Sequence, residues 1–153
     1  KKHDICEELG ASLCIDYKTE NFAKAIKKKT GGAGVDVLID FIAAPYLQDN
    51  LDVLNTDGRM ILLAVLGGVK VDSFNLFPLL VKRLSIMGST LRARSRDYKI
   101  KLTKDLYNFA WPLFEQQTLK PIIDSIFPWT EVADAHRYME ANKNKGKIIL
   151  RVD

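Results

Sequence analysis

The feature that most constrains this chain is a regular alternation of short apolar runs with amphipathic segments. Val35–Asp40 is a β-branched apolar run of strand length, typical of a strand that is buried on both faces of a parallel sheet. Comparable runs are expected to form strands at residues 12–17, 59–66, 84–91, 122–127 and 147–152. Because helical segments separate these runs, the pattern indicates right-handed crossovers and an α/β fold with a parallel, doubly wound sheet.

The helix boundaries follow from capping residues and breakers. Helices are expected at residues 2–9, 20–29, 75–82, 97–117 and 131–142. Thr19 and Asp97 are the expected N-caps, and Gly10 is the expected C-terminal stop. A further helix should begin near Pro45 and end at the turn 56–58, and Pro112 should kink the long helix. The helix after Pro45 should direct three leucines inward, Leu47, Leu51 and Leu54.

Composition excludes several classes of protein. At 153 residues with 47% hydrophobic and 27% charged residues, the chain suits one soluble domain, and its longest apolar stretch, 60–66, is far short of the ~20 residues of a membrane helix. We therefore expect no membrane span and a cytoplasmic location. The net charge of +4 comes partly from lysines near residues 24–29, which share a segment with Phe22 and Ile26 at helical spacing. They are interpreted as the solvated side of a helix, not as a nucleic-acid site.

The cysteines and histidines do not form a metal-binding pattern. Cys6 and Cys14 are the only cysteines, and neither lies in a Cys-x-x-Cys or Cys/His spacing that could hold zinc. Both are expected to be buried free thiols. His3 and His136 lie in expected helices, and neither has a carboxylate or cysteine at a sequence spacing that would indicate a site. They are therefore interpreted as structural or solvated.

The run Gly32-Ala33-Gly34-Val35-Asp36-Val37 begins like the dinucleotide fingerprint G-x-G-x-x-G, but Val37 occupies the last glycine position. A helix precedes this run and a strand follows it, whereas the fingerprint requires the reverse order. These glycines therefore indicate a helix stop and a turn.

Several local strings resemble the zinc-independent quinone oxidoreductase (zeta-crystallin-like) family of medium-chain dehydrogenases/reductases, in the family's order and spacing. They are Glu8-Leu9-Gly10-Ala11, Ile15-Asp16-Tyr17, Gly32-Ala33-Gly34-Val35-Asp36, Leu38-Ile39-Asp40, Asp57-Gly58-Arg59, Gly88-Ser89-Thr90-Leu91-Arg92-Ala93-Arg94 and Gly146-Lys147-Ile148-Ile149-Leu150. The resemblance covers almost the whole chain.

This resemblance implies a partial Rossmann-type sheet. In the family the sheet has the strand order 3-2-1-4-5-6, and the chain would begin in the helix after strand two. The first two strands, the glycine-rich phosphate loop and most of the catalytic domain would then lie outside this sequence. Residues 1–118 would be the C-terminal part of the NADPH-binding domain, and residues 119–153 the segment that returns to the catalytic domain. Such a fragment is expected to be inactive alone.

The resemblance also implies a set of cofactor contacts. Lys2 and Tyr17 match the lysine and tyrosine that hold the 2′-phosphate of NADPH in the family, a sensible pairing of a cation and a hydroxyl donor with a dianion. The other implied contacts follow the carboxyl ends of the next two strands or lie in the late turn 142–145: Ile42, Ala43, Ala64, Val65, Leu66 and Asn144. The family usually has glycine at the positions of Ala43 and Ala64.

The implied activity is hydride transfer from NADPH to a small quinone or enone, without metal. The cofactor supplies this chemistry, so no catalytic side chain is expected, and Asp40, at a strand end, receives no chemical role. Arg92 and Arg94 either border the substrate cleft or lie in a solvated loop. An enoyl or alkenal reductase of the same superfamily, or a non-catalytic nucleotide-binding or interaction domain, remains an alternative.

The family's usual dimer seam implies a homodimer in which the segment between Leu84 and Leu91 pairs with its twofold mate. Because strands one and two are not in this sequence, two strand edges should be unpaired. We expect the strands at 35–40, 59–66 and 84–91 to persist as a sheet, and residues 1–19 to be displaced from the family position or poorly ordered.

Overall fold

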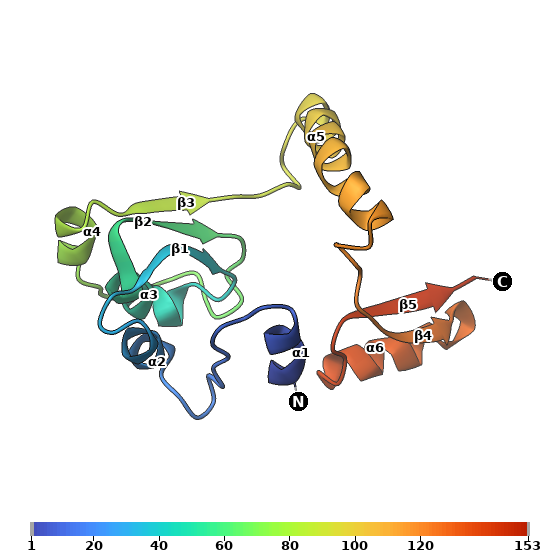
Figure 1. Ribbon diagram of the computed structural model, residues 1–153, viewed down its shortest axis with the longest axis horizontal. Coiled ribbons are helices and arrows are strands. Elements are labelled where there is room, and N and C mark those ends of the chain that lie inside the picture. The colour runs from blue at the N-terminus through green and yellow to red at the C-terminus, as the bar shows by residue number, and fades with distance from the viewer. Residues whose placement is uncertain (1, 153) are drawn as a thin grey trace. The chain divides into compact units, whose positions relative to one another are not determined.

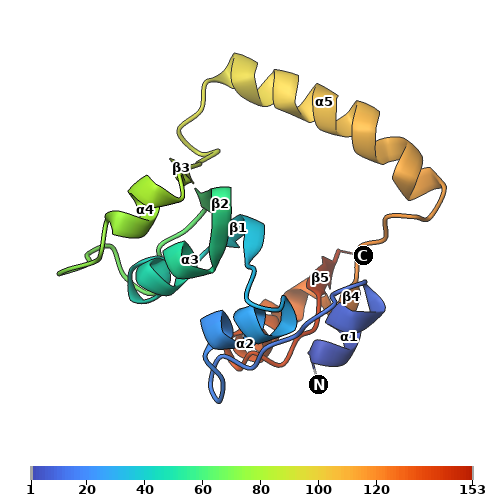
Figure 2. The same ribbon diagram turned by 60° about the vertical axis from the view of Figure 1, so that its left-hand side comes forward.

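The computed structural model describes residues 2–152 and divides into two compact units. The N-terminal unit is Cys6–Arg94, and the C-terminal unit combines residues 95–152 with residues 2–5. Figures 1 and 2 show both units from two directions. Every strand pair is parallel, so the expected α/β fold class is confirmed.

The N-terminal unit contains a three-stranded parallel sheet, with β1 (Val35–Asp40), β2 (Leu54–Leu62) and β3 (Ser85–Gly88) side by side in this order (Figure 1). Its helical elements are α1 (His3–Glu8), which begins in the other unit, α2 (Phe22–Lys29), η1 (Ala44–Tyr46), α3 (Leu47–Val53) and α4 (Phe77–Val81). The strand order is the one expected for the family's strands four, five and six. These three strands do persist as a sheet.

The core of this unit lies between one face of the sheet and helix α3. Leu51, Leu54 and Met60 are at most 2% exposed, and Leu84 joins them. Leu47, Leu38 and Leu79 pack around this cluster from α3, β1 and α4. The expected inward face of the helix after Pro45 is therefore confirmed, although Leu54 itself begins β2.

The opposite face of the sheet and its β1 edge are open. Val37 and Ile39 alternate with the buried side of β1 and are 49% and 56% exposed. On its other edge β1 has no strand partner among the described residues. An apolar, unpaired edge of this kind is a template for a further strand.

The C-terminal unit is built on a second, two-stranded parallel sheet. Its elements are α5 (Arg96–Glu115), β4 (Ile123–Pro128), η2 (Trp129–Glu131), α6 (Val132–Glu140) and β5 (Lys147–Arg151). Helix α6 connects the two strands and contacts both. At the start of β5, a Cβ on Gly146 would lie 2.4 Å from the Ile122 carbonyl oxygen, so only glycine permits this approach.

The prediction of a strand at residues 12–17 is wrong. This segment has no regular secondary structure and ends in a turn, where the backbone N–H groups of Thr19 and Glu20 donate to Asp16 O. A strand exists only where a partner supplies the ladder, and no strand of the unit lies beside these residues. The expectation that residues 1–19 leave their family position stays a prediction.

Two predicted N-caps are also wrong by a few residues. Asn21, not Thr19, caps α2 by accepting the Lys24 N–H at 2.9 Å. Ser95, not Asp97, caps α5 by accepting the Tyr98 N–H at 3.2 Å. In each case the residue immediately before the first helical residue carries the cap, because only that position aims its oxygen at the free N–H groups.

Element lengths differ modestly from expectation. The predicted turn at 56–58 lies inside β2, at an irregularity in the β1–β2 register where Asp57 has a φ of 63°. Residues 63–66 and 89–91 lie beyond the ends of β2 and β3, and α4, α5 and α6 are shorter than predicted. Contrary to expectation, the cysteines are not buried: Cys6 is exposed and Cys14 is half-buried, and the two form no disulfide.

Candidate functional site

The candidate site begins where β1 and β2 end. The Leu63 N–H donates to Asp40 O (2.9 Å), the Leu66 N–H to Phe41 O (3.0 Å) and the Gly67 N–H to Ile42 O (2.8 Å). These bonds join the two turns that follow the strands, 41–44 and 63–68, and together these turns form what we call the ledge. A ledge at the carboxyl ends of adjacent parallel strands is where doubly wound sheets bind ligands.

Ala43 holds an unusual backbone conformation in this ledge. Its φ is 72° and its ψ is −114°, the mirror image of the extended region, which glycine adopts freely and alanine does not. Such a conformation costs about 1–3 kcal/mol and persists only where its surroundings impose it. The side chain is 8% exposed. The turn after β1 is therefore strained at a residue that the sequence singled out.

The side chain of Asp40 hydrogen-bonds to the backbone of this turn. Its carboxylate accepts the Ile42 N–H at 2.7 Å and the Ala43 N–H at 3.1 and 3.2 Å. The Asn50 amide of α3 donates to the same carboxylate at 2.9 Å. Asp40 is 5% exposed and Asn50 4%. These partners occupy the carboxylate, so Asp40 fixes the backbone of the turn.

Tyr17 and Ile42 border the same hollow, of about 640 Å³, along the free edge of β1. Phe22, Tyr46 and the strand itself form its other walls. Tyr17 is 65% exposed, so its hydroxyl is accessible. Since most of this hollow follows an unpaired strand edge, we interpret it mainly as the place of a further strand, with Tyr17 at its margin.

Ala64 and Val65 lie in the turn after β2. They border a hollow of about 390 Å³ that also contacts Ser89, Thr90 and Arg94 after β3. Leu66 is largely exposed at the outer side of the turn. The structure thus brings Ile42, Ala43, Ala64, Val65 and Leu66 onto one ledge. Arg94 lies beside it and donates through Nε to Thr90 O at 3.3 Å.

Lys2 and Asn144 belong to the C-terminal unit. Lys2 Nζ donates to Asn142 Oδ1 at 2.6 Å, which brings the start of the chain to the late turn 142–146. Asn144 Nδ2 donates to Gly146 O at 2.8 Å, within that turn. The turn at 142–145 was expected from the resemblance, whereas its contact with Lys2 could not be seen from the sequence.

Asp124 fastens the same turn to β4. Its Oδ1 accepts the backbone N–H of Lys145 at 2.8 Å, and this N–H lowers the pKa of Asp124. The carboxylate in turn raises the pKa of the nearby Tyr138 phenol, because it favours the protonated hydroxyl. The turn that carries Asn144 is therefore held by an anionic side chain.

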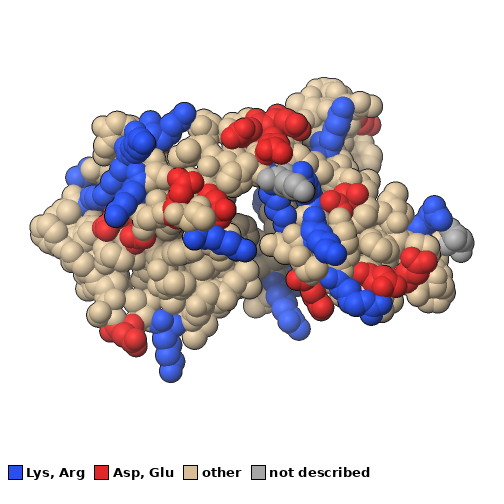
Figure 3. Space-filling model, turned by 90° about the horizontal axis from the view of Figure 1, so that it is seen from below, with Lys and Arg blue, Asp and Glu red and all other residues tan. Residues whose placement is uncertain are grey.

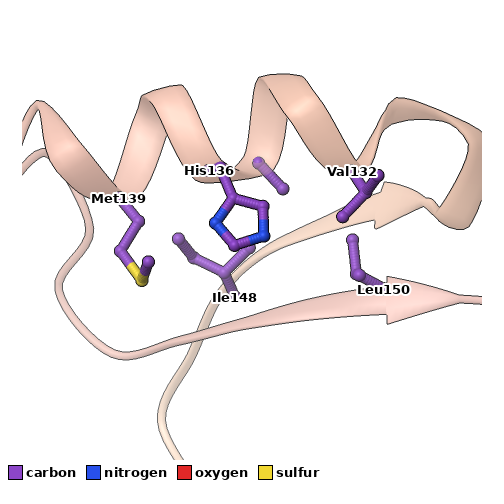
Figure 4. A pocket seen from close by; sticks show the side chains of 6 residues that line it. Val132, His136, Met139, Ile148 and Leu150 are labelled. Carbon is purple, nitrogen blue, oxygen red and sulfur yellow. The ribbon is translucent and has the colours of Figure 1, made fainter.

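A small hollow of about 130 Å³ lies between α6 and β5 (Figure 4). His136 points into it beside Met139, Ile148, Val132 and Leu150. No carboxylate or thiol borders it. The interpretation of His136 as a structural or solvated residue stays a prediction.

Sequence reasoning missed two polar side chains of the N-terminal unit, Asn50 beside the ledge and Lys82 at the opposite end of the sheet, where β2 begins. Asn50 is a polar residue on the inward face of α3, near Leu47 and Leu51. A polar residue at such a position could have been recognised in the sequence as a buried group that needs a hydrogen-bond partner. Lys82 reaches the end of α3, where its ammonium donates to the carbonyl oxygens of Leu51, Asp52 and Leu54 at 3.1, 2.9 and 2.9 Å. Nothing local in the sequence indicates that contact.

The fold and the ledge define a nucleotide-binding sheet of the dehydrogenase type. The model of the family described as zinc-binding dehydrogenase matches residues 9–150, and the chain belongs to this family, within the medium-chain dehydrogenase/reductase superfamily. Among residues 2–152, no group of three or more His, Cys, Asp or Glu side chains could hold a metal ion. The described residues thus offer no fit for the zinc in the family's name.

Three similar proteins illustrate the relationship. The chain is 30% identical over 145 residues to a rat quinone oxidoreductase, covering 92% of this chain and 41% of that one. It is 27% identical over 162 residues to the rat synaptic vesicle membrane protein VAT-1 homolog, covering 97% and 40%. The crystal structure of a 2-haloacrylate reductase matches with a TM-score of 0.75 and 29% identity, covering 99% and 47%. The chain therefore spans about two fifths of the curated relatives it matches.

Proposed function

We propose that this chain is the C-terminal part of an NADPH-dependent, zinc-independent oxidoreductase that transfers hydride to quinones or related conjugated carbonyls. Residues 1–118 would complete the nucleotide-binding domain, and residues 119–153 would return to the catalytic domain. The observation that carries the proposal is the ledge formed by the turns 41–44 and 63–68 at the carboxyl ends of β1 and β2. Family membership and the similarity to a quinone oxidoreductase support it.

The open β1 edge supports the view that the sheet continues beyond this chain. Val37, Ile39 and Phe41 are about half exposed along it, although they are apolar. A further strand would pair with the backbone N–H and C=O groups of this edge and cover part of these side chains. We therefore expect catalysis only from the longer protein.

In this proposal the residues of the chain bind and orient the cofactor, and bound NADPH supplies the hydride. The Tyr17 hydroxyl and the Lys2 ammonium would hold the 2′-phosphate. The Lys2 ammonium donates one of its three N–H groups to Asn142, so two N–H groups are left for a phosphate. Ile42, Ala43, Ala64, Val65 and Leu66 would contact the rest of the cofactor, with Asn144 near its nicotinamide half.

The test is the cofactor preference of the full-length protein. We expect the protein to prefer NADPH over NADH. The double variant Tyr17→Phe, Lys2→Ala should reduce this preference, because it weakens the binding of NADPH and leaves the binding of NADH unchanged. Tyr107→Phe is the matched control, because Tyr107 is exposed on α5, outside the proposed contacts. Equal use of both cofactors by the unmutated protein would overturn the assignment of Lys2 and Tyr17.

A second candidate is reduction of the double bond of an enone or a similar activated alkene. The 29% identity to a 2-haloacrylate reductase favours it. Parallel assays with quinones and with enones separate the two candidates. Cofactor binding without turnover of either substrate class would favour a non-catalytic nucleotide-binding or interaction domain.

The remaining parts of the proposal concern partners and location. Among the described residues, no helix is long and apolar enough to cross a bilayer. On the face shown in Figure 3, Lys and Arg side chains are interspersed with Asp and Glu, so this face does not present a purely basic surface for nucleic acid. Small-molecule substrates and a cytoplasmic location remain predictions.

A further inference from the structure

The turn 41–44 has a geometry that its own residues do not favour. Ala43 adopts φ 72° and ψ −114°, a conformation disfavoured for any residue with a Cβ. An isolated Phe-Ile-Ala-Ala turn would relax away from it. The position of the Ile42 and Ala43 backbone in the proposed cofactor site must therefore be imposed by surrounding groups.

Asp40 and Asn50 are the side chains placed to impose it, beside the backbone bonds from the turn 63–68. The Asp40 carboxylate binds two successive N–H groups of the turn, at 2.7 Å and at 3.1 to 3.2 Å, and so fixes the orientation of both peptide planes. Asn50 donates to the Asp40 Oδ2 atom at 2.9 Å and ties the carboxylate to α3. Because both side chains are at least 95% buried, water cannot substitute for either.

We propose that Asp40 and Asn50 act together as positioning residues that hold the strained turn 41–44 in the conformation that binds the nicotinamide cofactor. This inference rests on the proposed function, since the turn is one side of the proposed cofactor site. Asp40 does not touch the cofactor. It acts through the Ile42 and Ala43 backbone, and Asn50 acts through Asp40.

The experiment compares NADPH affinity and folding in variants of the full-length protein. Asp40→Asn keeps the shape of the side chain but removes the charge and leaves one acceptor oxygen for the three donors of Ile42, Ala43 and Asn50. We expect NADPH to bind roughly tenfold more weakly or worse, as for a misplaced binding element. Asn50→Ala leaves the bonds from Asp40 to the turn in place, so a smaller loss is expected.

A second-site change separates positioning from general support of the core. Glycine adopts the conformation of Ala43 without strain, so Ala43→Gly should restore much of the NADPH affinity of Asp40→Asn and of Asn50→Ala. A loss caused only by unsatisfied buried groups would not be restored, because Ala43→Gly supplies no partner for them. The matched control is Asn55→Ala, which breaks an Asn–Asp bond of 2.8 Å to Asp36 at the opposite end of β1 and β2. It should leave NADPH affinity unchanged.

The outcomes are distinct. Weak binding that Ala43→Gly restores supports the inference. Unchanged NADPH affinity in a folded Asp40→Asn variant overturns it while the proposed function stands, and so does a loss that Ala43→Gly fails to restore. If Asp40→Asn does not fold, Asn50→Ala with and without Ala43→Gly decides in the same way. Absence of nicotinamide binding by the unmutated protein overturns the proposed function and this inference with it.

Discussion

Lys82 provides the sharpest test of how the N-terminal unit is held together. Its ammonium lies 3.1 Å from Leu51 O and 2.9 Å from both Asp52 O and Leu54 O, at the C-terminal end of α3. These carbonyls have no partner within the helix, because the chain turns at once into β2. Lys82→Met removes the charge and the three donors but keeps a side chain of similar length.

The expected cost follows from this geometry. A cation at a partly buried helix C-terminus stabilises by up to ~2 kcal/mol, and a hydrogen bond involving a charged group contributes about 1.5–3 kcal/mol. The three bonds share one ammonium, so their contributions do not add. Methionine retains the apolar contacts of the stem and offsets part of the loss. We therefore expect Lys82→Met to lower the free energy of unfolding by about 2 kcal/mol.

Urea denaturation of the full-length protein measures this change. Lys70→Met is the matched control, since Lys70 is an exposed lysine in the loop after β2, and it should change the free energy of unfolding by less than about 0.5 kcal/mol. If both substitutions have the same small effect, Lys82 does not cap α3 and the reasoning is refuted.

Two further predictions concern the C-terminal unit and the sheet edge. The Lys145 N–H lowers the pKa of Asp124, so this carboxylate stabilises the fold above its unfolded pKa, near ~3.9, and the contribution is lost as the pH falls through the lower folded value. Asp124→Asn should therefore flatten the acid side of the stability profile, and an unchanged profile in urea titrations would contradict this. The edge strand β3, within the segment between Leu84 and Leu91, is predicted to pair with its mate in a homodimer. Met87→Lys, at this exposed edge, should shift the mass measured by light scattering towards that of the monomer. If the unmutated protein is already a monomer, the predicted dimer interface through β3 is wrong.

The sequence was sufficient for the elements whose signals are local. The run Val35–Asp40 predicts β1 with its observed bounds, because a β-branched apolar stretch of six residues carries its own strand signal. Leu47 and Leu51 predict the buried face of α3 through helical periodicity. Ile42 was placed at a strand end because it follows such a run, whereas Ala64 was included in the predicted strand 59–66 and lies beyond the end of β2. Their role in binding a cofactor remains a prediction.

Only the tertiary structure decided the features that depend on distant partners. Residues 12–17 have a strand-like composition but form no strand, because pairing needs a neighbour that composition does not supply. The bond from Asn50 to Asp40 joins residues ten apart, and Lys82 reaches carbonyls 28 to 31 residues away. The pattern of apolar side chains encodes which face of an element is buried. The strained conformation of Ala43, in contrast, depends on the side chains of Asp40 and Asn50, which only the folded chain brings to the turn.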